Sequence, residues 1–588
     1  MYKDLNLKIG IELHQQLSGK KLFCECSSSL EEENFISQIR RKIRVVFGEL
    51  GEMDIAGAYE MLRDKEFIYN CYKNETCLVD CDEEPCHIIN QDHLKNTLKL
   101  AKFLRLQIPS YLCIMRKNVF DGSVSPAFQR TTIVGLESKD SFIETSQGKV
   151  KLEQLNLEED ASKIISKENN KIIYSLSRQG IALWELGTDA TIKSPSHAVE
   201  VAKHLGMIFR SFDCIKRGIG TIRQDVNISI KNGARVEIKG WQDLKTLKLL
   251  IENEIQRQVS LIALKNKKII IEKKEVTNVF KNCKFKIVQK LLEENAIILA
   301  LKIENFNFKQ EICRSKTLGK EIAEYATAYG VNGLIHSDEE LKKYNLEVEF
   351  QELRELFKAK NNDLILIICE KEKVCKKAMD AVIERLNLIK NGVLEETRIP
   401  NYSNATSSYA RPLPGSSRMY PETDHPLIKV ENLDKLERVI LLTEKINLIM
   451  KKYNISESLA KEILEEDIEH YLDKNARFRA HCLIEIPKEI KTRFNLDGLK
   501  PENIYEVIKR VENNEISKEV IIEVLIDFLK NKRFNFEKFK KKNIDEQEII
   551  KIIQENKNAS FNAIMGIVMK KFKGIDTRKL IETIKKNI

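Results

Sequence analysis

Alternating hydrophobic and polar residues begin near the N-terminus, in the run KIGIELHQQL of residues 8–17. Ile9, Ile11 and Leu13 alternate with polar residues, which predicts a β-strand with one buried face. Glu12 and His14 then share the opposite face. A carboxylate and an imidazole held side by side can bind a divalent metal, but solvent exposure alone would also produce a polar strand face.

Two further alternating runs, 223–230 and 235–239, predict a β-hairpin around an Asn-Gly pair. A two-residue loop would mix polar and apolar side chains on one face, so we expect a three-residue loop, 231–233, with Gly233 left-handed. The polar face would suit phosphate, ribose and metal, or would be an ordinary solvated face. The expected cross-strand pairs are Ser229–Arg235, Asn227–Glu237 and Asp225–Lys239.

Helical and mixed patterns follow this strand-rich first part. Hydrophobic residues near 3.6-residue spacing predict a helix over 243–261. Beyond residue 432 the pattern is helical, and either Asn454 or Ser456 could cap the helix that carries Leu459. Over residues 265–395, between these two helical regions, short β-like runs alternate with helical ones, which is typical of a compact α/β or α+β insert. The β-like runs are 269–271, 297–303 and 364–368, and the helical ones are 279–293, 318–329 and 378–390.

Acidic motifs are the next candidates for chemistry. In LEEDA, residues 157–161, consecutive carboxylates repel one another unless a cation compensates or a solvated segment carries them. Glu185 lies in an otherwise apolar run, where a carboxylate must be paired or bound to a metal. A loop over 121–132 leads to Gln129 and Arg130, and its arginine could bind a phosphate or carboxylate.

Composition indicates an ordinary globular protein of roughly three to five domains, with 588 residues, 42% of them hydrophobic and 32% charged. No apolar run reaches the ~18 residues of a membrane span, and the first residues, MYKDLNLKIG, lack the apolar core of a signal peptide. We therefore expect a cytoplasmic protein. Its net charge of +10 permits binding to nucleic acid.

The thirteen cysteines are irregularly spaced, which favours reduced thiols over a disulfide framework. Cys24 and Cys26 lack a nearby C-x-x-C partner. The later group of Cys71, Cys77, Cys81 and Cys86 with His87 matches no standard zinc knuckle, so the spacing does not favour a metal site at these thiols and leaves the question open. The sequence also lacks a phosphate-binding P-loop, an H-E-x-x-H motif and a G-x-S-x-G nucleophile elbow.

In order along the chain, these motifs resemble the GatB/GatE family. The matching passages are KIGIELHQQL, KLFCEC, TCLVDCDEEP, DGSVSPAFQRT, LEEDA, GTIRQDVNISIKNGARVEIKG and EETRIPNYSNATSSYARPLPGSSRMYPETDHP. The resemblance covers nearly the whole chain, and the last passage is highly specific. One departure concerns zinc, because the paired cysteines that bind it in many bacterial members of the family are only half present here.

The resemblance implies an α+β multidomain fold. A β-rich, cradle-like catalytic domain (1–264, returning over 396–431) would hold an aspartyl-tRNA-synthetase-like α/β insert over 265–395. A helical domain (432–504) and a helical, tRNA-binding tail (505–588) would follow. The position of the insert is similar to that in the archaeal branch of the family.

The resemblance also implies an ATP- and Mg²⁺-dependent amidotransferase. The γ-carboxylate of glutamate misacylated on tRNA(Gln) would be phosphorylated, and ammonia would then displace phosphate. The ammonia would come from a partner amidase, the asparaginase-like GatD, in a heterotetramer with two copies of each protein. The implied metal ligands are His14, Glu158 and Glu185. The implied catalytic residues are Glu12, Arg223, Asp225 and Lys239, and the implied nucleotide and substrate contacts are Gln129, Arg130, Arg235 and Glu237.

Two alternatives remain open at this point. One is a bacterial-type GatB, acting on Glu- or Asp-tRNA with a different ammonia source. The other is a non-catalytic tRNA-binding protein. Gathered carboxylates at Glu12, Glu158 and Glu185 would favour catalysis, because RNA binding gains nothing from them.

Overall fold

We describe the protein from a computed structural model. The described residues are 2–45, 47, 51–63, 65–168, 171–415, 419–420, 425–473, 475–540, 546–556, 561–571, 581 and 585–586. They divide into two compact units, Met1–Val439 and Ile440–Ile588. Within the family-like passage EETRIPNYSNATSSYARPLPGSSRMYPETDHP (395–426), residues 416–418 and 421–424 lie outside the described residues, as do parts of the predicted tail.

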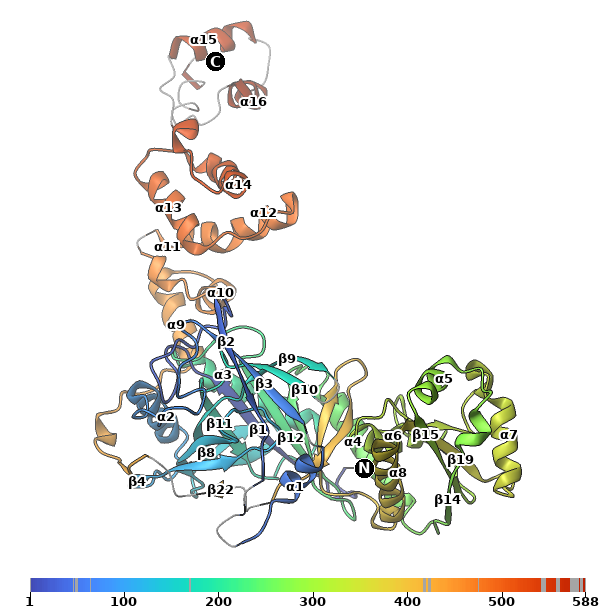
Figure 1. The fold of residues 1–588 in the computed structure, drawn as a ribbon. Coiled ribbons are helices and arrows are strands. Elements are labelled where there is room, and N and C mark those ends of the chain that lie inside the picture. Colours follow the sequence, from blue (N-terminus) through green and yellow to red (C-terminus); the bar gives the residue numbers. More distant parts are fainter. Residues whose placement is uncertain are drawn as a thin grey trace. The chain divides into compact units, whose positions relative to one another are not determined.

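One large sheet organises the first unit (Figure 1). Its strands run in the order β21-β20-β13-β12-β1-β11-β8-β6-β5-β22, and β7 pairs with β8. Their bounds are β1 (Lys8–Gln16), β5 (Ile114–Asn118), β6 (Phe128–Leu136), β7 (Phe142–Thr145), β8 (Gly148–Glu159), β11 (Ala182–Thr188), β12 (Ile222–Ser229), β13 (Val236–Trp241), β20 (Glu396–Asn401), β21 (Thr406–Pro412) and β22 (Met419–Tyr420). Strand β1 therefore lies near the middle of the sheet, between β11 and β12.

Helices cover the apolar face of this sheet. The helices are α2 (Gln91–Phe103), α3 (Pro195–Arg210) and α4 (Leu247–Ala263). As the alternation predicts, Ile9, Ile11 and Leu13 are almost fully buried, and α3 packs against β1. Trp184 on β11 contacts Phe209 at the end of α3. The other face carries the polar residues of the same strands.

The predicted hairpin forms, but its turn differs from the expectation. Asn227 pairs with Glu237 as predicted, and the register shifts between Gln224 and Val226. The register next to the turn is the predicted one, but β12 ends at Ser229 and β13 begins at Val236, so the connection is longer than the three residues predicted. Asn232, with φ +65°, takes the left-handed conformation predicted for Gly233. Gly233 has a different role: a Cβ there would lie 2.4 Å from Gln258 Oε1.

A smaller sheet, in the order β2-β3-β10-β9, packs on its own core. Its strands are β2 (Phe35–Arg41), β3 (Glu66–Tyr72), β9 (Lys163–Glu168) and β10 (Lys171–Ser175). Helix α1 (Ile55–Leu62) lies between β2 and β3 in the chain, and the pair β4 (Tyr111–Leu112) and β23 (Ile428–Lys429) forms separately. Tyr69 and Tyr174 stack in this core. The segments 17–34 and 73–90, which connect these sheets, carry Cys24, Cys26, Cys77, Cys81 and Cys86.

The predicted insert has its own sheet, β14-β15-β19-β18, and its own hydrophobic core (Figure 1). The strands are β14 (Ile271–Glu275), β15 (Ala296–Ile303), β18 (Ile335–His336) and β19 (Leu364–Lys371), with the small pair β16 (Glu311–Cys313) and β17 (Lys316–Thr317). The helices are α5 (Lys286–Glu293), α6 (Leu318–Thr327), α7 (Glu347–Leu356) and α8 (Glu372–Asn387). The predicted helix over 279–293 begins only at Lys286, because a short 3₁₀ turn, Thr277–Phe280, precedes it.

A buried charge network joins the insert to the large sheet. Arg398 on β20 pairs with Glu321 of α6 at 2.9 Å, and Arg257 of α4 pairs with the same carboxylate at 2.6 Å. Lys316 on β17 contacts Glu321 at 2.6 Å and Glu324 at 2.8 Å. We call Glu254, Arg257, Lys316, Glu321, Glu324, Glu396 and Arg398 the junction network. It lies where β20 returns from the insert to pair in parallel with β13.

The described part of Ile440–Ile588 is mainly helical, as predicted. Its α-helices are α9 (Leu442–Tyr453), α10 (Glu457–Glu465), α11 (Ala476–Ala480), α12 (Ile486–Phe494), α13 (Pro501–Glu512), α14 (Ile521–Asn531), α15 (Glu546–Glu555) and α16 (Phe561–Lys571). Ser456 rather than Asn454 caps α10, through its side-chain oxygen and Leu459 N. Asn454 instead ends α9 in a left-handed conformation.

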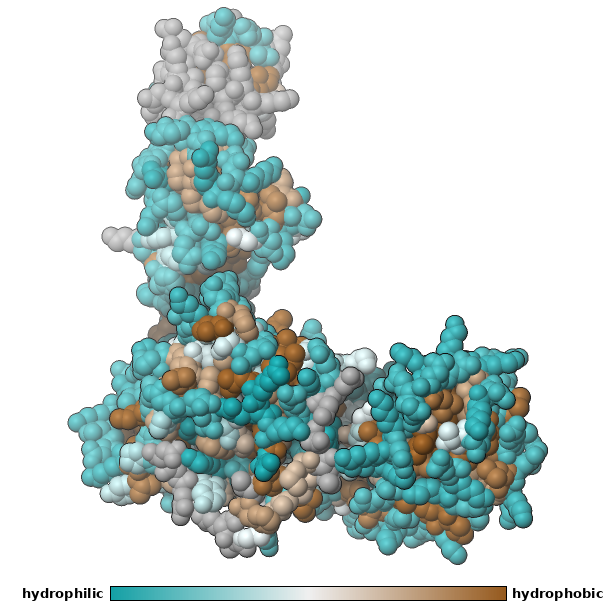
Figure 2. Space-filling view, viewed as in Figure 1, coloured by the Kyte–Doolittle hydropathy of each residue, from teal (hydrophilic) through white to brown (hydrophobic). Residues whose placement is uncertain are grey.

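The hydropathy of the surface and the state of the cysteines agree with what the sequence predicts. Hydrophilic residues cover most of the face seen in Figure 2. Among the described residues, no helix combines the length and apolar character that a membrane crossing needs. All thirteen cysteines are free thiols, as predicted.

Candidate active site

His14, Glu158 and Glu185 come together on the polar face of the large sheet. His14 on β1 lies opposite Glu185 on β11 in register, and Glu158 follows on the neighbouring β8. One potential ligand atom from each lies within 4.8 Å of the others. The three residues predicted as metal ligands therefore form one group, although they are far apart in the sequence.

A second acidic group lies beside the first. Glu12 is two residues before His14 on the same strand face, and it lies opposite Asp225 of β12. Glu237 of β13 completes a set whose carboxylate oxygens lie within 4.8 Å of one another. The two groups interact, because Glu185 is one of the charges that act on Glu12. Together they form what we call the acidic face: Glu12, His14, Glu158, Glu185, Asp225 and Glu237.

Two lysines supply the ion pairs of the acidic face. Lys117 on β5 lies 2.9 Å from Glu158 and 3.0 Å from Glu185. Lys239 on β13 lies 2.9 Å from both Asp225 and Glu237. Five carboxylates therefore share two ammonium groups, which leaves an excess of negative charge. This excess suits divalent cations, whose preferred ligands include carboxylate oxygens.

The pKa values of these carboxylates reflect the crowding. Burial, followed by the charges of Glu185, Glu237 and Asp225, raises the pKa of Glu12 to about 7. Burial and then Glu185 also raise the pKa of Glu158. Burial would raise the pKa of Glu185 too, but Lys117 and His14 hold it below its usual value. A bound cation would relieve the repulsion that raises the first two.

Several residues that support the acidic face were not among the predicted site residues. Thr131 donates a hydrogen bond to Glu158 at 3.1 Å, and Asn227 donates one to Glu12 at 2.9 Å. Thr397 on β20 donates one to Glu237 at 2.9 Å. Lys117 was missed as well. Asn227 was recognisable from strand alternation, whereas Lys117 and Thr397 lie in distant segments that carry no local signal.

The other predicted site residues have varied positions. Arg223, opposite His14 in register, pairs with Asp160 of LEEDA at 2.7 Å. Gln129 donates to the backbone oxygen of Glu159 at 2.7 Å. Arg130 lies one position before Thr131 on β6, so it points to the opposite side of the sheet, where it binds Glu159. Arg235 is exposed in the connection before β13 and lies outside the acidic face.

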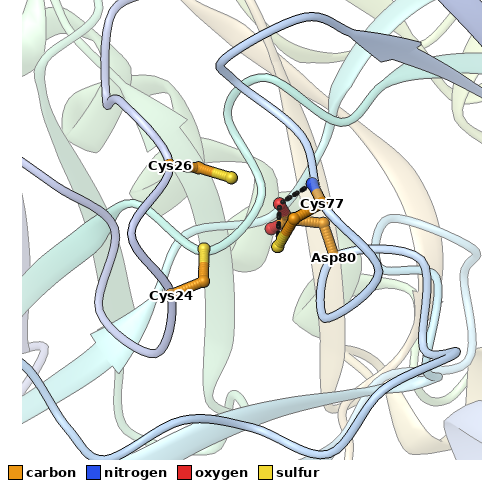
Figure 3. Close-up of side chains that lie close together, drawn as sticks. All are labelled: Cys24, Cys26, Cys77 and Asp80. Atoms are coloured by element: carbon orange, nitrogen blue, oxygen red, sulfur yellow. Dashed lines mark hydrogen bonds between the residues drawn. The ribbon is translucent and has the colours of Figure 1, made fainter.

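The structure also gathers thiols that were not predicted to meet. Cys24 and Cys26 come from one loop, and Cys77 and Asp80 come from a second (Figure 3). Their potential ligand atoms lie within 4.8 Å of one another. We call these four residues the thiol cluster. Spacing rules missed it, because about fifty residues separate the two loops and the fourth member is an aspartate.

Sequence comparison agrees with this arrangement. The family described as the GatB/GatE catalytic domain matches residues 7–434, which include the acidic face and the thiol cluster. The chain belongs to the GatB/GatE family.

Similar full-length relatives in this family come from archaea. Proteins of Methanocaldococcus jannaschii and Sulfurisphaera tokodaii are each 36% identical to the chain. The first alignment covers 99% of this chain and 98% of the relative, and the second covers 100% and 99%. Both relatives are named as the E subunit of glutamyl-tRNA(Gln) amidotransferase.

Two cations implied by the family resemblance can be tested against these residues. The acidic face offers oxygen and imidazole donors with excess negative charge, and so fits Mg²⁺. The thiol cluster offers three sulfur atoms and one carboxylate, a donor set that fits structural Zn²⁺. Although the paired cysteines of many bacterial members are only half present here, Cys24, Cys26, Cys77 and Asp80 still offer four potential ligands.

Proposed function

We propose that this chain converts Glu-tRNA(Gln) to Gln-tRNA(Gln) as GatE, the E subunit of an ATP-dependent amidotransferase. The observation that carries the proposal is the acidic face, where His14, Glu158 and Glu185 adjoin Glu12, Asp225 and Glu237. A non-catalytic RNA-binding protein would have no use for this concentration of carboxylates next to a polyanion. The full-length relatives carry the name of the E subunit, which favours this assignment over a bacterial-type GatB.

The chemical task is to bring a carboxylate and a triphosphate together despite their like charges. An oxygen of the glutamyl γ-carboxylate attacks the γ-phosphorus of ATP, and ADP leaves. Ammonia then attacks the acyl carbon, and phosphate leaves with the oxygen that bridged carbon and phosphorus. Phosphoryl transfer depends mainly on positioning and on electrostatic stabilisation of the transferred group.

The chain's residues divide these tasks. His14, Glu158 and Glu185 would hold Mg²⁺, and Glu12, Asp225 and Glu237 would hold a second divalent cation. Bound Mg²⁺ neutralises phosphate oxygens and orients the triphosphate. Lys117 and Lys239 are positioned to contact anionic groups of the substrates, because each lies between two carboxylates on the same face.

The remaining predicted contacts support the site in different ways. Arg223 fixes Asp160 next to the metal-binding residues. Gln129 lies near the same face through its bond to the Glu159 backbone. Arg130 would act indirectly, because its ion pair with Glu159 braces the strand that carries Glu158. Arg235 lies in the exposed connection before β13, so it would contact nucleotide or tRNA only at the edge of the acidic face.

Substrate and partner complete the proposal. The chain has no nucleophile motif of its own for releasing ammonia, which supports supply by the asparaginase-like amidase GatD in a cytoplasmic heterotetramer. The basic charge of +10 supports binding of tRNA. The insert and the helical unit are the proposed tRNA contacts, with an aspartyl-tRNA-synthetase-like role for the insert.

The proposal is tested with Glu185→Gln in the purified complex. We expect ADP formation in the presence of Glu-tRNA(Gln) to fall at least about 100-fold, because an electrostatic contact to the transferred group is lost. Binding of tRNA should stay unchanged. Glu153→Gln, at an exposed position of β8, is the matched control. Unchanged ADP release in Glu185→Gln would contradict the proposal.

A further inference from the structure

The thiol cluster contains a buried lysine partner in addition to its four potential ligands. Lys21 belongs to the same loop as Cys24 and Cys26, and its backbone N–H donates to Cys26 O at 2.9 Å. Its side chain is fully buried, as is that of Asp80, and the two form an ion pair at 3.0 Å. Lys21 Nζ also donates to Leu176 O at 3.0 Å. A buried ammonium with two fixed partners is a built feature of this site.

The two oxygens of Asp80 have different partners. Oδ1 contacts the ammonium of Lys21, whereas Oδ2 accepts a hydrogen bond from Cys77 N at 3.1 Å, on the side of the thiols (Figure 3). A metal among the thiols could therefore bind Oδ2 while Oδ1 stays with Lys21. Hydrogen bonds from neighbours to a ligating carboxylate are the usual way in which proteins orient such ligands.

A glycine, Gly180, packs directly against this ion pair, and a residue with a side chain would be crowded there. Gly180 has φ +80°, and a Cβ there would lie 3.0 Å from Asp80 Oδ1 and 3.4 Å from Lys21 Cδ. Its N–H donates to Asp160 O, and its carbonyl accepts from Leu22 N. The same short segment thus connects the lysine loop to LEEDA, which carries Glu158.

Charge balance explains why a lysine belongs here. Zn²⁺ with three thiolates and one carboxylate carries a net charge of about −2, which is costly in a buried site. The adjacent ammonium of Lys21 reduces this to about −1. It also neutralises Asp80 in the metal-free chain.

We infer that Asp80 is the fourth ligand of a Cys₃Asp zinc site and that Lys21 shares this carboxylate with the metal. Cys24, Cys26 and Cys77 supply the three sulfur ligands. Zinc binding releases their thiol protons to solvent and forms three Zn–S bonds and one Zn–O bond, with no change of oxidation state. Because Lys21 holds Asp80 in either state, the two loops stay together when the metal is removed.

The ligand set is tested by spectroscopy on the full-length chain, independently of enzymatic activity. After removal of metal and reloading, we expect one Zn²⁺ per chain by mass spectrometry. With Co²⁺ instead, thiolate-to-metal absorption should report three sulfur ligands. Asp80→Cys should raise this absorption by about one third, and Asp80→Ala should weaken metal affinity at least about tenfold. Cys86→Ser, outside the cluster, is the control and should change neither value.

The role of Lys21 is tested by thermal unfolding of Lys21→Met. Without the ammonium, the metal-free variant keeps a buried, unpaired carboxylate and should unfold at a lower temperature than the metal-free wild type. Zinc should therefore stabilise Lys21→Met by more degrees than it stabilises the wild type. An equal zinc-dependent shift in both proteins would overturn the shared-carboxylate role.

Two other results would overturn the site itself. One is a reloaded wild-type chain with substoichiometric zinc and no Co²⁺–thiolate absorption. The other is an Asp80→Cys variant whose Co²⁺ spectrum equals that of the wild type, which would show that residue 80 is not a ligand. Should Asp80→Ala fail to fold, the wild-type and Asp80→Cys spectra still decide the question.

Discussion

The junction network and the acidic face both gather charged side chains on strands of the same sheet, but their charge balance differs. In the junction network, four glutamates share Arg257, Lys316 and Arg398. On the acidic face, five carboxylates form ion pairs with two lysines of the described residues, Lys117 and Lys239. The junction is close to neutral without any ligand, whereas the acidic face is left with unbalanced negative charge.

This difference distinguishes a structural charge cluster from the proposed functional one. At the junction, burial alone would raise the pKa of Glu321, but Arg398, Lys316 and Arg257 hold it well below its usual value. On the acidic face, burial and neighbouring carboxylates raise the pKa of Glu12 to about 7. The first carboxylate stabilises the fold when ionised, and the second needs a cation to balance its charge. Shifted pKa values of this second kind are typical of functional sites.

The largest expected effect concerns stability at the junction. Glu321→Gln leaves three buried cations without their shared partner, and breaking such a pair costs about 3 to 5 kcal/mol. Urea unfolding monitored at pH 7 should show this loss, while the Mg²⁺ dependence of ADP formation stays unchanged. Glu352→Gln on the exposed side of α7 is the control. A variant as stable as the wild type would contradict the structural role of the junction.

The pH dependence of this loss has a definite sign. Because the folded-state pKa of Glu321 is lowered from 4.5, its contribution is present above about pH 4.5 and is lost as the pH falls toward the lowered value. The stability gap between the wild type and Glu321→Gln should therefore narrow below about pH 4.5.

A smaller effect is expected at the residue that connects the two regions. Thr397 lies between Glu396 and Arg398 of the junction, and its hydroxyl donates to Glu237 of the acidic face. Thr397→Val removes a hydrogen bond to a charged group, worth about 1.5 to 3 kcal/mol. Mn²⁺ binding followed by electron paramagnetic resonance should weaken about tenfold, and Thr397→Ser should restore it. Equal Mn²⁺ binding by the valine and serine variants would show that the Thr397 hydroxyl does not support cation binding.

The smallest expected effect is a gain in stability, whereas most substitutions lower stability. Glu12→Gln removes one of the crowded carboxylates, so the metal-free chain should gain about 1 kcal/mol in EDTA at pH 8. Since the folded pKa of Glu12 is raised from 4.5 to about 7, its contribution is fully present below about pH 4.5 and is lost as the pH rises through 7, so the gain should be largest above pH 7 and shrink toward pH 4.5. Thermal unfolding at pH 6 and 8 measures this. A less stable variant at pH 8 would contradict the claim of excess charge.

Local patterns were sufficient for the strands and for part of the site. Alternation placed Glu12 and His14 on one face of β1, because side-chain direction in a strand is a local property. It also gave the Asn227–Glu237 pair. It failed at the turn, where Asn232 rather than Gly233 takes the left-handed conformation.

Contacts between distant segments could not be predicted in this way. Nothing near Lys117 indicates that it will lie between Glu158 and Glu185. Asp80 carries no zinc-ligand signal until its loop meets that of Cys24. Arg130 was predicted as a substrate contact, but its strand position turns it toward Glu159. Family resemblance grouped the proposed metal ligands in advance, whereas their contacts with Lys117 and Thr131 could be found only from the fold.

Transfer of isotopic oxygen from the glutamyl carboxylate to phosphate tests the proposed phosphoryl transfer. Glutamyl-tRNA(Gln) labelled with ¹⁸O in the γ-carboxylate is incubated with the complete enzyme, ATP, Mg²⁺ and an ammonia source, and the released phosphate is analysed by mass spectrometry. If the acidic face transfers the γ-phosphoryl group to the carboxylate, each phosphate carries one oxygen from glutamate. Phosphate without label, or label in AMP, would contradict this account.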